Sequence, residues 1–258
     1  MNSRRRQDTV DSLILELAKR GDMPRGQAHE CPYMPDRDAI EEGCVVDSLD
    51  PETYHELMDI GYRRSGRVLY RPRCPRCSAC QSIRIPVDEF APSRSQRRAW
   101  RKNQDLNFRM GPPTLTDEKI DLYQRYLDGQ HPETKQADDV EGLEEFLYTS
   151  CVNTIEVTYR LPDGKLIAVS VLDMSSTAAS SMYHFFDPDE SKRSLGVYSV
   201  VNEIELCKRL DLTHYYLGFW IRGCRTMDYK ARYFPHEILI DEAWYRAEPS
   251  ADPPPTID

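Results

Sequence analysis

Cysteines at regular spacing are the densest group of potential metal ligands in this sequence. Cys74, Cys77 and Cys80 follow one another with two residues between each pair, close enough for their thiolates to bind one ion. Cys31, in another turn-like segment, is the best candidate for a fourth ligand. Four thiolates suit a structural zinc ion or an iron–sulfur cluster equally well. The pattern therefore predicts a metal site without selecting the metal, and the alternative is a set of reduced, unligated thiols.

Basic residues are concentrated in one part of an acidic chain. The net charge is −9, yet residues 61–109 contain 13 Lys and Arg against three Asp and Glu, so this segment carries +10 and the remainder −19. Such a surplus is typical of a surface that neutralises phosphates, and the alternative is a solvated charged face. We therefore predict nucleic-acid binding by arginines of this segment, including Arg63, Arg64, Arg84, Arg97 and Arg98.

A further candidate anion site lies where a strand is expected to give way to a helix. Arg193, Ser194, Leu195 and Gly196 occupy this junction. Backbone N–H groups at a helix N-terminus could hold phosphate or ester oxygens there. An ordinary helix start is the alternative, because Ser and Gly are common at such positions.

Two more residues could perform acid–base or nucleophilic chemistry, but the sequence supplies them with no partner. His184 lies in an apolar strand, where a histidine is more often a satisfied core residue. Cys224 has no base tied to it by any pattern. Neither is predicted to be catalytic.

The elements that must position these residues change character along the chain. Helical patterns are followed by strand patterns and then by alternation of the two. We expect helices at 9–20, 51–60, 94–103, 116–127, 140–149 and from 194 onward, and strands at 155–161, 166–172, 181–186, 215–220 and 237–240. A helix that joins two strands of one sheet makes part of that sheet parallel. The order therefore predicts an α+β fold with a mixed sheet.

A break at residues 111–113, Gly-Pro-Pro, separates arginine-rich sequence from mixed acidic and apolar sequence. We expect a smaller basic, cysteine-containing N-terminal domain over 1–110, a catalytic domain over 111–247 and a disordered proline-rich tail over 248–258. The basic N-terminus has no apolar segment behind it, and no run approaches the ~18 apolar residues of a membrane span. The expectation is a cytoplasmic protein without a membrane partner, with reduced cysteines.

Several blocks of sequence resemble the arginyl-tRNA–protein transferase family. They lie in both halves of the chain, at residues 61–66, 70–72, 83–84, 163–169, 187–189, 194–199, 215–219 and 227–230. The short form with the cysteine triplet is similar to the bacterial aspartate/glutamate leucyltransferases. The resemblance implies transfer of leucine from Leu-tRNA to the N-terminal amine of proteins that begin with Asp or Glu. That transfer would mark the acceptor for the N-degron degradation machinery.

The catalytic domain of this family has the fold of the GNAT N-acyltransferases, which agrees with the expected order of elements. Three alternatives remain open. The donor could be Arg-tRNA with the same acceptors. An acyl-CoA-dependent N-acyltransferase is disfavoured because Tyr198 stands where the pyrophosphate loop of those enzymes has a small residue. A non-catalytic, zinc-dependent RNA-binding protein is disfavoured by the acyltransferase-like second half.

An aminoacyl ester on tRNA is already activated, so we expect neither a covalent intermediate nor a cofactor for the chemistry. Orientation of amine and ester can contribute ~7 to 11 kcal/mol, and each donor to the oxyanion ~2.7 to 4 kcal/mol. We predict that Arg63, Arg64 and Lys230 pair with the acceptor's carboxylate, that Asp187 holds its ammonium group, and that residues 194–198 hold the end of the tRNA. The residues predicted to be catalytic are Asp187, Tyr198, Tyr216 and Lys230.

Overall fold

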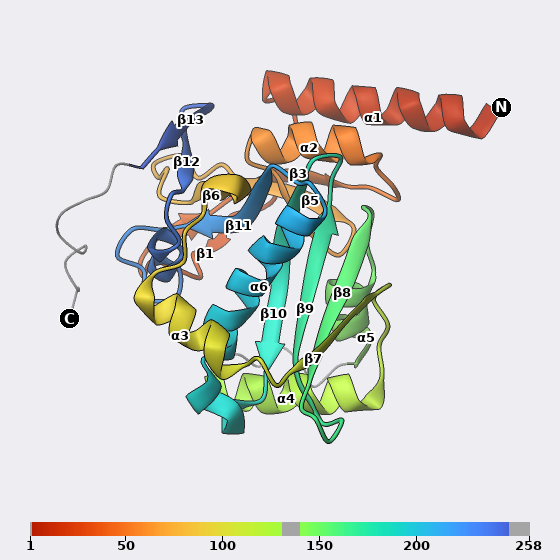
Figure 1. Cartoon of the computed structure of the whole chain (residues 1–258). Coiled ribbons are helices and arrows are strands. Elements are labelled where there is room, and N and C mark those ends of the chain that lie inside the picture. The colour runs from red at the N-terminus through yellow and green to blue at the C-terminus, as the bar shows by residue number, and fades with distance from the viewer. Residues whose placement is uncertain (1, 131–139, 248–258) are drawn as a thin grey trace.

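A computed structural model describes residues 2–130 and 140–247 of the chain, and its main feature is a mixed sheet of eight strands (Figure 1). In spatial order the strands are β13 (Ala243–Arg246), β12 (Glu237–Ile240), β6 (Gln81–Pro86), β11 (His214–Trp220), β10 (Ala178–Phe186), β9 (Leu166–Met174), β8 (Thr154–Arg160) and β7 (Asn107–Gly111). The pair β10–β11 is parallel, and the other neighbours are antiparallel. The predicted α+β class with a mixed sheet is confirmed.

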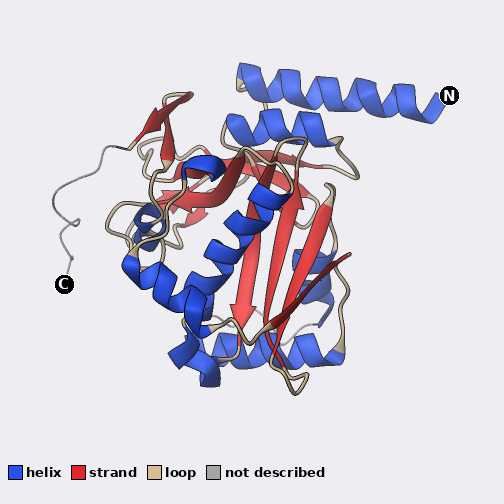
Figure 2. Ribbon diagram, viewed as in Figure 1, coloured by secondary structure: helices blue, strands red, loops and turns tan. Residues whose placement is uncertain are grey.

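Helices cover both faces of this sheet (Figure 2). On one face lies α6 (Leu195–Arg209), whose apolar residues enter the largest hydrophobic cluster, with α3 (Arg94–Lys102) beside it. On the other face lie α4 (Asp117–Gln130), α5 (Val140–Leu143) and the π-helical turn η2 (Glu144–Tyr148). Because both faces are covered, the middle strand β9 is buried from Leu166 to Asp173, which accounts for its nearly unbroken apolar sequence.

A smaller assembly sits at one end of the large sheet, at the top of Figure 1. It contains α1 (Asn2–Arg20), α2 (Pro51–Asp59), a three-stranded sheet and a two-stranded one, with a hydrophobic cluster of its own. The strands are β3 (Glu41–Val45), β5 (Val68–Pro72), β4 (Arg63–Ser65), β1 (His29–Glu30) and β2 (Asp38–Ala39). Asp50 caps α2 by accepting hydrogen bonds from the backbone of Glu52 and Thr53, and Pro51 follows at the first turn. Three 3-10 helices complete the described elements: η1 (Val87–Glu89), η3 (Pro188–Arg193) and η4 (Asp228–Arg232).

The parallel pair β10–β11 is short and then divides. The two strands pair only at Ala178–His214, Ala179–Tyr215 and Ser180–Tyr216. Register shifts follow on both outer sides, at 181–183 against β9 and at 216–218 against β6. A shift of this kind bends a strand. The two strands therefore separate beyond Ser180, and a wedge opens between them.

The domain boundary expected after residue 110 does not coincide with a boundary between two sheets, because both parts of the chain contribute strands to the large sheet. The strand β6, from the first part of the chain, lies inside the large sheet between β12 and β11, and β7 forms the opposite edge. The sequence pattern had not predicted β6, β7, β13 or the small sheets, since most of these strands are short or charged. Also, α1 begins before residue 9, at Asn2. The tail predicted over 248–258 lies outside the described residues.

Ser194 lies at the start of α6, where a helix was expected, but it does not cap the helix with its side chain. It has a left-handed backbone (φ 56°), and its side chain makes no capping hydrogen bond.

In the part of the chain that the structure describes, no helix combines the length and apolar character needed to cross a membrane.

Candidate active site

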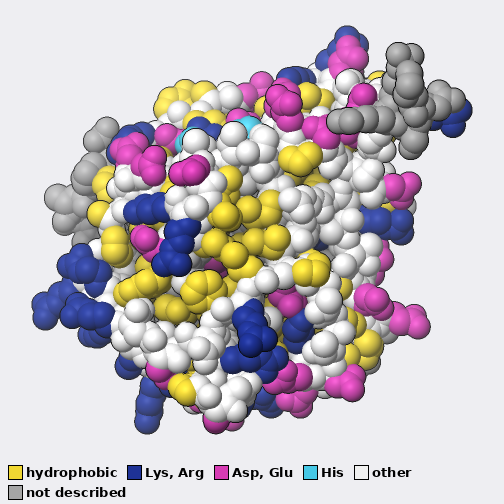
Figure 3. Space-filling model, turned by 45° about the vertical axis from the view of Figure 1, so that its right-hand side comes forward, with side chains coloured by type: hydrophobic (Ala, Val, Ile, Leu, Met, Phe, Trp, Pro, Cys, Tyr) yellow, Lys and Arg dark blue, Asp and Glu magenta, His cyan; other side chains and the backbone are white. Residues whose placement is uncertain are grey.

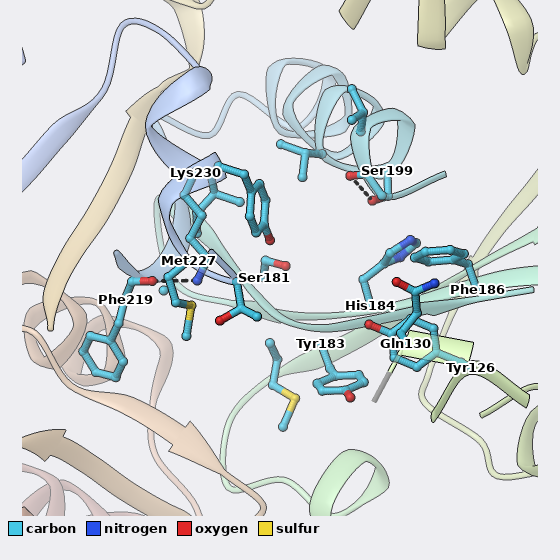
Figure 4. A pocket seen from close by; sticks show the side chains of 18 of the residues that line it. Tyr126, Gln130, Ser181, Tyr183, His184, Phe186, Ser199, Phe219, Met227 and Lys230 are labelled. Carbon is cyan, nitrogen blue, oxygen red and sulfur yellow. Dashed lines mark hydrogen bonds between the residues drawn. The ribbon is translucent and has the colours of Figure 1, made fainter. Parts of the chain in front are cut away.

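A pocket of about 980 Å³ opens in the wedge between β10 and β11 (Figure 4). The divided strands form its floor, and β4, β5, η4 and the start of α6 supply its walls. The pocket is therefore built from residues far apart in the sequence, from Pro32 to Tyr233.

Arg63 lies at the point where the two strands divide. Its guanidinium donates to Ser180 Oγ at 3.2 Å and to the backbone carbonyl of Ser181, just beyond the last residue of β10 that pairs with β11. Gly218 makes room for it, because a Cβ at that position would lie 2.8 Å from the guanidinium. Gly218 also has φ +81°, a conformation that favours glycine. The absence of a side chain at Gly218 thus makes room for Arg63, and the backbone conformation at this position favours glycine as well.

Lys230, from η4, supplies a second cation on the same side of the pocket. It is 9% exposed, and its Nζ donates to the carbonyl oxygen of Phe219 at 2.6 Å (Figure 4). Burial, followed by the positive charge of Arg63, lowers the pKa of Lys230 to about 7. A substrate carboxylate at this end would favour the charged form of the lysine.

The other end of the pocket is aromatic. Phe146 and Tyr183 meet edge to face with ring centroids 5.3 Å apart, and Tyr126 and Phe186 do so at 5.2 Å. Figure 4 shows Tyr126, Tyr183 and Phe186 grouped with His184 on the side away from Lys230. These rings form a wall suited to an apolar side chain. This wall could not be predicted from the sequence, because its residues come from β10, α4 and η2 and share no local pattern.

The start of α6 borders the pocket, as predicted. Ser194, Leu195 and Gly196 all line it. The nearest atom to a Cβ added at Gly196 would be a ring carbon of Phe186 at 3.9 Å, so the approach to this helix end is open. The first N–H groups of an α-helix have no acceptor within the helix and can receive an oxyanion.

Asp187 lies beside the pocket but does not line it. It is fully buried, with ion pairs to Arg125 at 2.7 Å and Lys165 at 2.8 Å. Burial raises the pKa of its carboxyl, but the hydrogen bond from Lys165 and the positive charge of Arg125 outweigh burial, and the pKa falls below its ordinary value. The structure therefore shows Asp187 as the centre of an ion-pair cluster rather than as a free base.

Tyr198 and Tyr216 also lie outside the pocket. The Tyr198 ring packs in the core, with ring centroids 5.7 Å from both Trp100 and Tyr159. Its bulk therefore does not block the helix N-terminus, and the steric reason for disfavouring an acyl-CoA-dependent enzyme does not hold. The Tyr216 hydroxyl donates to Asp59 at 2.5 Å and receives a hydrogen bond from Arg84 at 3.1 Å.

Three of the predicted anion-binding arginines are committed to ion pairs. Arg64 contributes to the pocket wall, but its guanidinium is buried against Asp173, with its closest contact at 2.6 Å. Arg84 pairs with Asp59 and Glu237, and Arg193 pairs with Asp105 and Glu190. Arg63, Arg64 and Lys230 were predicted to pair with the acceptor's carboxylate. Because Arg64 is paired with Asp173, Arg63 and Lys230 are the two that stay candidates for this role.

Arg97 and Arg98 are exposed on α3, a helix capped by Ser93 and Gln96. A hydrogen bond from Lys102 to the carbonyl of Lys192 joins this helix to η3, which directly precedes α6. On the face drawn in Figure 3, Lys and Arg side chains lie to the left of and below an area of hydrophobic side chains. The helix α3 packs beside α6, whose start lines the pocket. This position suits the predicted contact of Arg97 and Arg98 with tRNA phosphates.

The four predicted metal ligands lie together. Cys31, Cys74, Cys77 and Cys80 line one small cavity of about 30 Å³. Burial, followed by the neighbouring thiols, raises the pKa of Cys80 to about 12. Over residues 2–130 and 140–247, no group of three or more His, Cys, Asp or Glu has the arrangement of a metal site. The cluster of thiols is thus found where expected, and a bound zinc ion or iron–sulfur cluster stays a prediction.

Comparison with known proteins gives two family matches and many relatives. Residues 29–98 match the family described as "Arginine-tRNA-protein transferase, N terminus", and residues 118–240 match "Arginine-tRNA-protein transferase, C terminus". A protein of Hahella chejuensis is 38% identical over 220 residues, covering 84% of this chain and 93% of the relative. One of Nitrosococcus oceani is 41% identical over 216 residues, covering 83% and 91%. Both are named aspartate/glutamate leucyltransferase.

Solved structures align only distantly. L-PGS from Bacillus licheniformis aligns with a TM-score of 0.44 at 11% identity, over 67% of this chain and 51% of that one. A tandem GNAT protein from the clavulanic acid biosynthesis pathway aligns at 0.39 and 12%, over 92% and 68%. The sequence relatives, and not these structures, therefore indicate the family.

Proposed function

The chain belongs to the arginine-tRNA–protein transferase family, and on that premise we propose that it transfers leucine from Leu-tRNA to the N-terminal amine of proteins that begin with Asp or Glu. The names of the relatives support both the donor and the acceptors. As in the interpretation of the sequence, the transferred leucine would mark the acceptor for degradation.

The observation that carries the choice of donor is the charge of the pocket. Its described lining includes Arg63, Arg64 and Lys230 but no Asp or Glu. Arg64 is already neutralised by Asp173, so an arginyl side chain would meet the cations Arg63 and Lys230 and the aromatic rings, without a carboxylate of the described lining to pair with it. Desolvating an unpaired charge is costly, so this pocket favours an uncharged donor side chain and an acidic acceptor.

The two ends of the pocket suit the two substrates. Arg63 and Lys230 would receive the carboxylate of an N-terminal Asp or Glu. The aromatic wall would receive the leucyl side chain, whose full burial is worth about 1.5–3 kcal/mol. The backbone at Leu195 and Gly196 would donate to the oxyanion that forms when the α-amine attacks the ester. Most of the catalysis would then come from orientation, with no covalent intermediate.

A transfer assay tests the proposal. Purified protein is supplied with [14C]Leu-tRNA or [14C]Arg-tRNA and with peptides that differ only in a first residue of Asp, Glu or Ala. We expect label from leucine on the Asp and Glu peptides alone. Label from arginine would overturn the choice of donor, and label on the Ala peptide would overturn the choice of acceptor. Transfer from neither tRNA would overturn the enzymatic proposal.

A further inference from the structure

The helix α3 has two faces of different character. Its outer face consists of four exposed arginines: Arg94, Arg97, Arg98 and Arg101. Its inner face, turned toward the protein, carries two amide side chains, Gln96 near one end and Asn103 at the other. Residues at this spacing lie on the same side of a helix, two turns apart. Gln96 is 4% exposed and Asn103 is 0% exposed. Both ends of α3 thus direct a buried amide into the protein.

Gln96 connects the first turn of α3 to η4. Its side-chain oxygen accepts from the backbone N–H of Ser93 at 2.7 Å as part of the helix cap, and its NH2 group donates to the carbonyl oxygen of Arg232 at 3.1 Å. Arg232 ends η4 and lies between Lys230 and Tyr233, which both line the pocket. The amide of Gln96 therefore holds the segment that carries the cation on the acceptor side.

Asn103 connects the other end of α3 to the start of α6. Its NH2 group donates to the carbonyl oxygens of Ala99 and Arg193, both at 2.9 Å. Arg193 directly precedes Ser194, where the left-handed backbone leads into α6. The guanidinium of Arg193 adds to this connection, since two of its nitrogens each lie 2.9 Å from a carboxylate oxygen of Asp105. Asn103 therefore holds the segment whose N–H groups face the pocket.

Each of these amides has a partner outside α3, which capping of the helix alone does not require. A backbone N–H only donates and a backbone carbonyl only accepts, so the partners fix the orientation of each amide. Removing either NH2 group would leave a carbonyl next to the pocket without this donor. Gln104 provides the contrast, because it is exposed and its amide donates to the carbonyl of Trp100, within α3, at 2.9 Å.

We propose that α3 is a bridge that fixes the separation of the two halves of the active site, with Gln96 positioning Lys230 and Asn103 positioning the start of α6. This inference rests on the aminoacyl transfer proposed above. Attack of the α-amine on the ester requires both substrates at one separation, and an error of about 1 Å can lower the rate on the order of 10²-fold. Gln96 and Asn103 are positioning residues, because neither belongs to the described lining of the pocket.

The outer face of this bridge is the one predicted to contact tRNA. Phosphate contacts fix the position of a nucleic acid on a protein without reading its sequence. Since α3 is connected to the pocket at both ends, a tRNA bound to its arginines would have a fixed position relative to the acceptor side and the donor side. The affinity for tRNA would depend on the outer face and not on the two buried amides.

Steady-state kinetics with Leu-tRNA and an Asp peptide test the two connections separately. Gln96→Glu keeps the oxygen that caps the helix and loses the NH2 group, so we expect KM for the peptide to rise about tenfold with kcat little changed. Asn103→Leu loses the donors at similar volume. We expect it to lower kcat about 10- to 100-fold with KM for the peptide unchanged, because the oxyanion forms only in the transition state.

Two further variants complete the kinetic test. Asp105→Asn weakens the donor-side connection at an exposed position and should cause a smaller fall in kcat. Gln104→Ala should behave as the parent protein, and all four variants should bind tRNA as tightly as the parent in filter binding. Parent-like kinetics for Gln96→Glu and Asn103→Leu, or the same proportional changes in kcat and KM for both, would overturn the bridge.

Hydrogen exchange measured by mass spectrometry tests the bridge without any transfer. We expect Asn103→Leu to speed the exchange of backbone amides in residues 194–198 but not in 228–233, and Gln96→Glu to do the reverse. Gln104→Ala should alter neither segment. Equal changes in both segments, or none, would overturn the bridge even if leucine is transferred. If the parent transfers no leucine, the proposed function fails, while the exchange rates still decide whether α3 connects these segments.

Discussion

Gly218 and Arg63 lie together at the point where β10 and β11 divide, and a side chain at position 218 would displace the guanidinium of Arg63. A Cβ on Gly218 would lie 2.8 Å from the guanidinium carbon and 3.2 Å from Nε. Arg63 in turn donates to the backbone carbonyl of Ser181, where the pairing of β10 with β11 has ended. This contact ties the shape of the wedge to the position of the pocket's cation.

Gly218→Ala should therefore displace Arg63. We expect a loss of at least about tenfold in kcat/KM on acidic peptides, together with about 1 kcal/mol or more of destabilisation from the positive φ. Gly164→Ala is the control, since Gly164 has φ +96° and no atom within 4 Å of an added Cβ. Transfer assays and chemical denaturation of both variants check this. Equal losses of activity in the two would show that backbone strain, and not Arg63, is responsible.

Arg63→Gln tests acceptor recognition. Losing a charged hydrogen bond to the acceptor's carboxylate should lower kcat/KM for Asp and Glu peptides about 10- to 100-fold. Any trace of transfer to an Ala peptide should not change. Arg67→Gln, in the same hairpin but exposed and paired with Asp47 at 3.2 Å, serves as the control. An equal loss on all three peptides would mean that Arg63 holds the pocket's shape rather than the acceptor.

Arg64 should matter for stability rather than for transfer. Arg64→Met leaves Asp173 buried without its partner, and breaking such a pair costs about 3–5 kcal/mol. Arg160→Met, which breaks a partly exposed pair with Glu118, should cost about 1 kcal/mol or less. Urea denaturation compares the two. Similar free energies of unfolding would contradict a structural role for the buried pair.

Glu203 should make stability depend on pH. Its pKa is raised from 4.5 to about 7 by burial, so the folded protein binds a proton that the unfolded chain has already released in this range. The contribution of this group to stability is therefore fully present below about pH 4.5, decreases as pH rises, and is lost above about pH 7. As pH rises from about 4.5 to about 7, the free energy of unfolding of Glu203→Gln should therefore increase by on the order of 3 kcal/mol relative to that of the parent. Denaturation at several pH values, with Glu205→Gln alongside as the half-buried control on the same helix α6, would contradict this if the two variants follow the same curve.

Arg97 and Arg98 should contribute to tRNA affinity through phosphates. Changing both to Gln should weaken binding of charged and uncharged tRNA alike and reduce the slope of log affinity against log salt by about one for each phosphate that is no longer neutralised. Arg20→Gln, at the end of α1 and paired with Glu16, is the control. Filter binding at several salt concentrations measures both. An unchanged slope would place the tRNA elsewhere on the surface.

Local pattern predicted the long elements well. The strands around 155–161 and 166–172 and the helices around 51–60 and 116–127 are close to those observed, because a single apolar period specifies each one. Short strands such as β4 and β7 carry charged or exposed side chains and are stabilised by their neighbours, so their own sequence gives little signal.

The candidate site was also predictable only in part, because local sequence pattern does not show which side chains come together in the fold. Lys230, Arg63 and residues 194–196 stand in recognisable blocks, and the structure places them at one pocket. Tyr198 and Tyr216 stand in similar blocks but turn into the core, a direction that residue type does not reveal. The hydrogen-bond partner of His184 is Ser170 on another strand, 14 residues away, so only the register of β9 against β10 could identify it.

The position of β6 also bears on how the chain folds during synthesis. This strand leaves the ribosome early, but its two neighbours in the sheet begin only at His214 and Glu237. Pairing over such sequence separations is slow, because a long loop must close before any contact forms. The N-terminal half cannot then complete its fold while the rest is being translated, and the sheet should close only when nearly the whole chain has emerged.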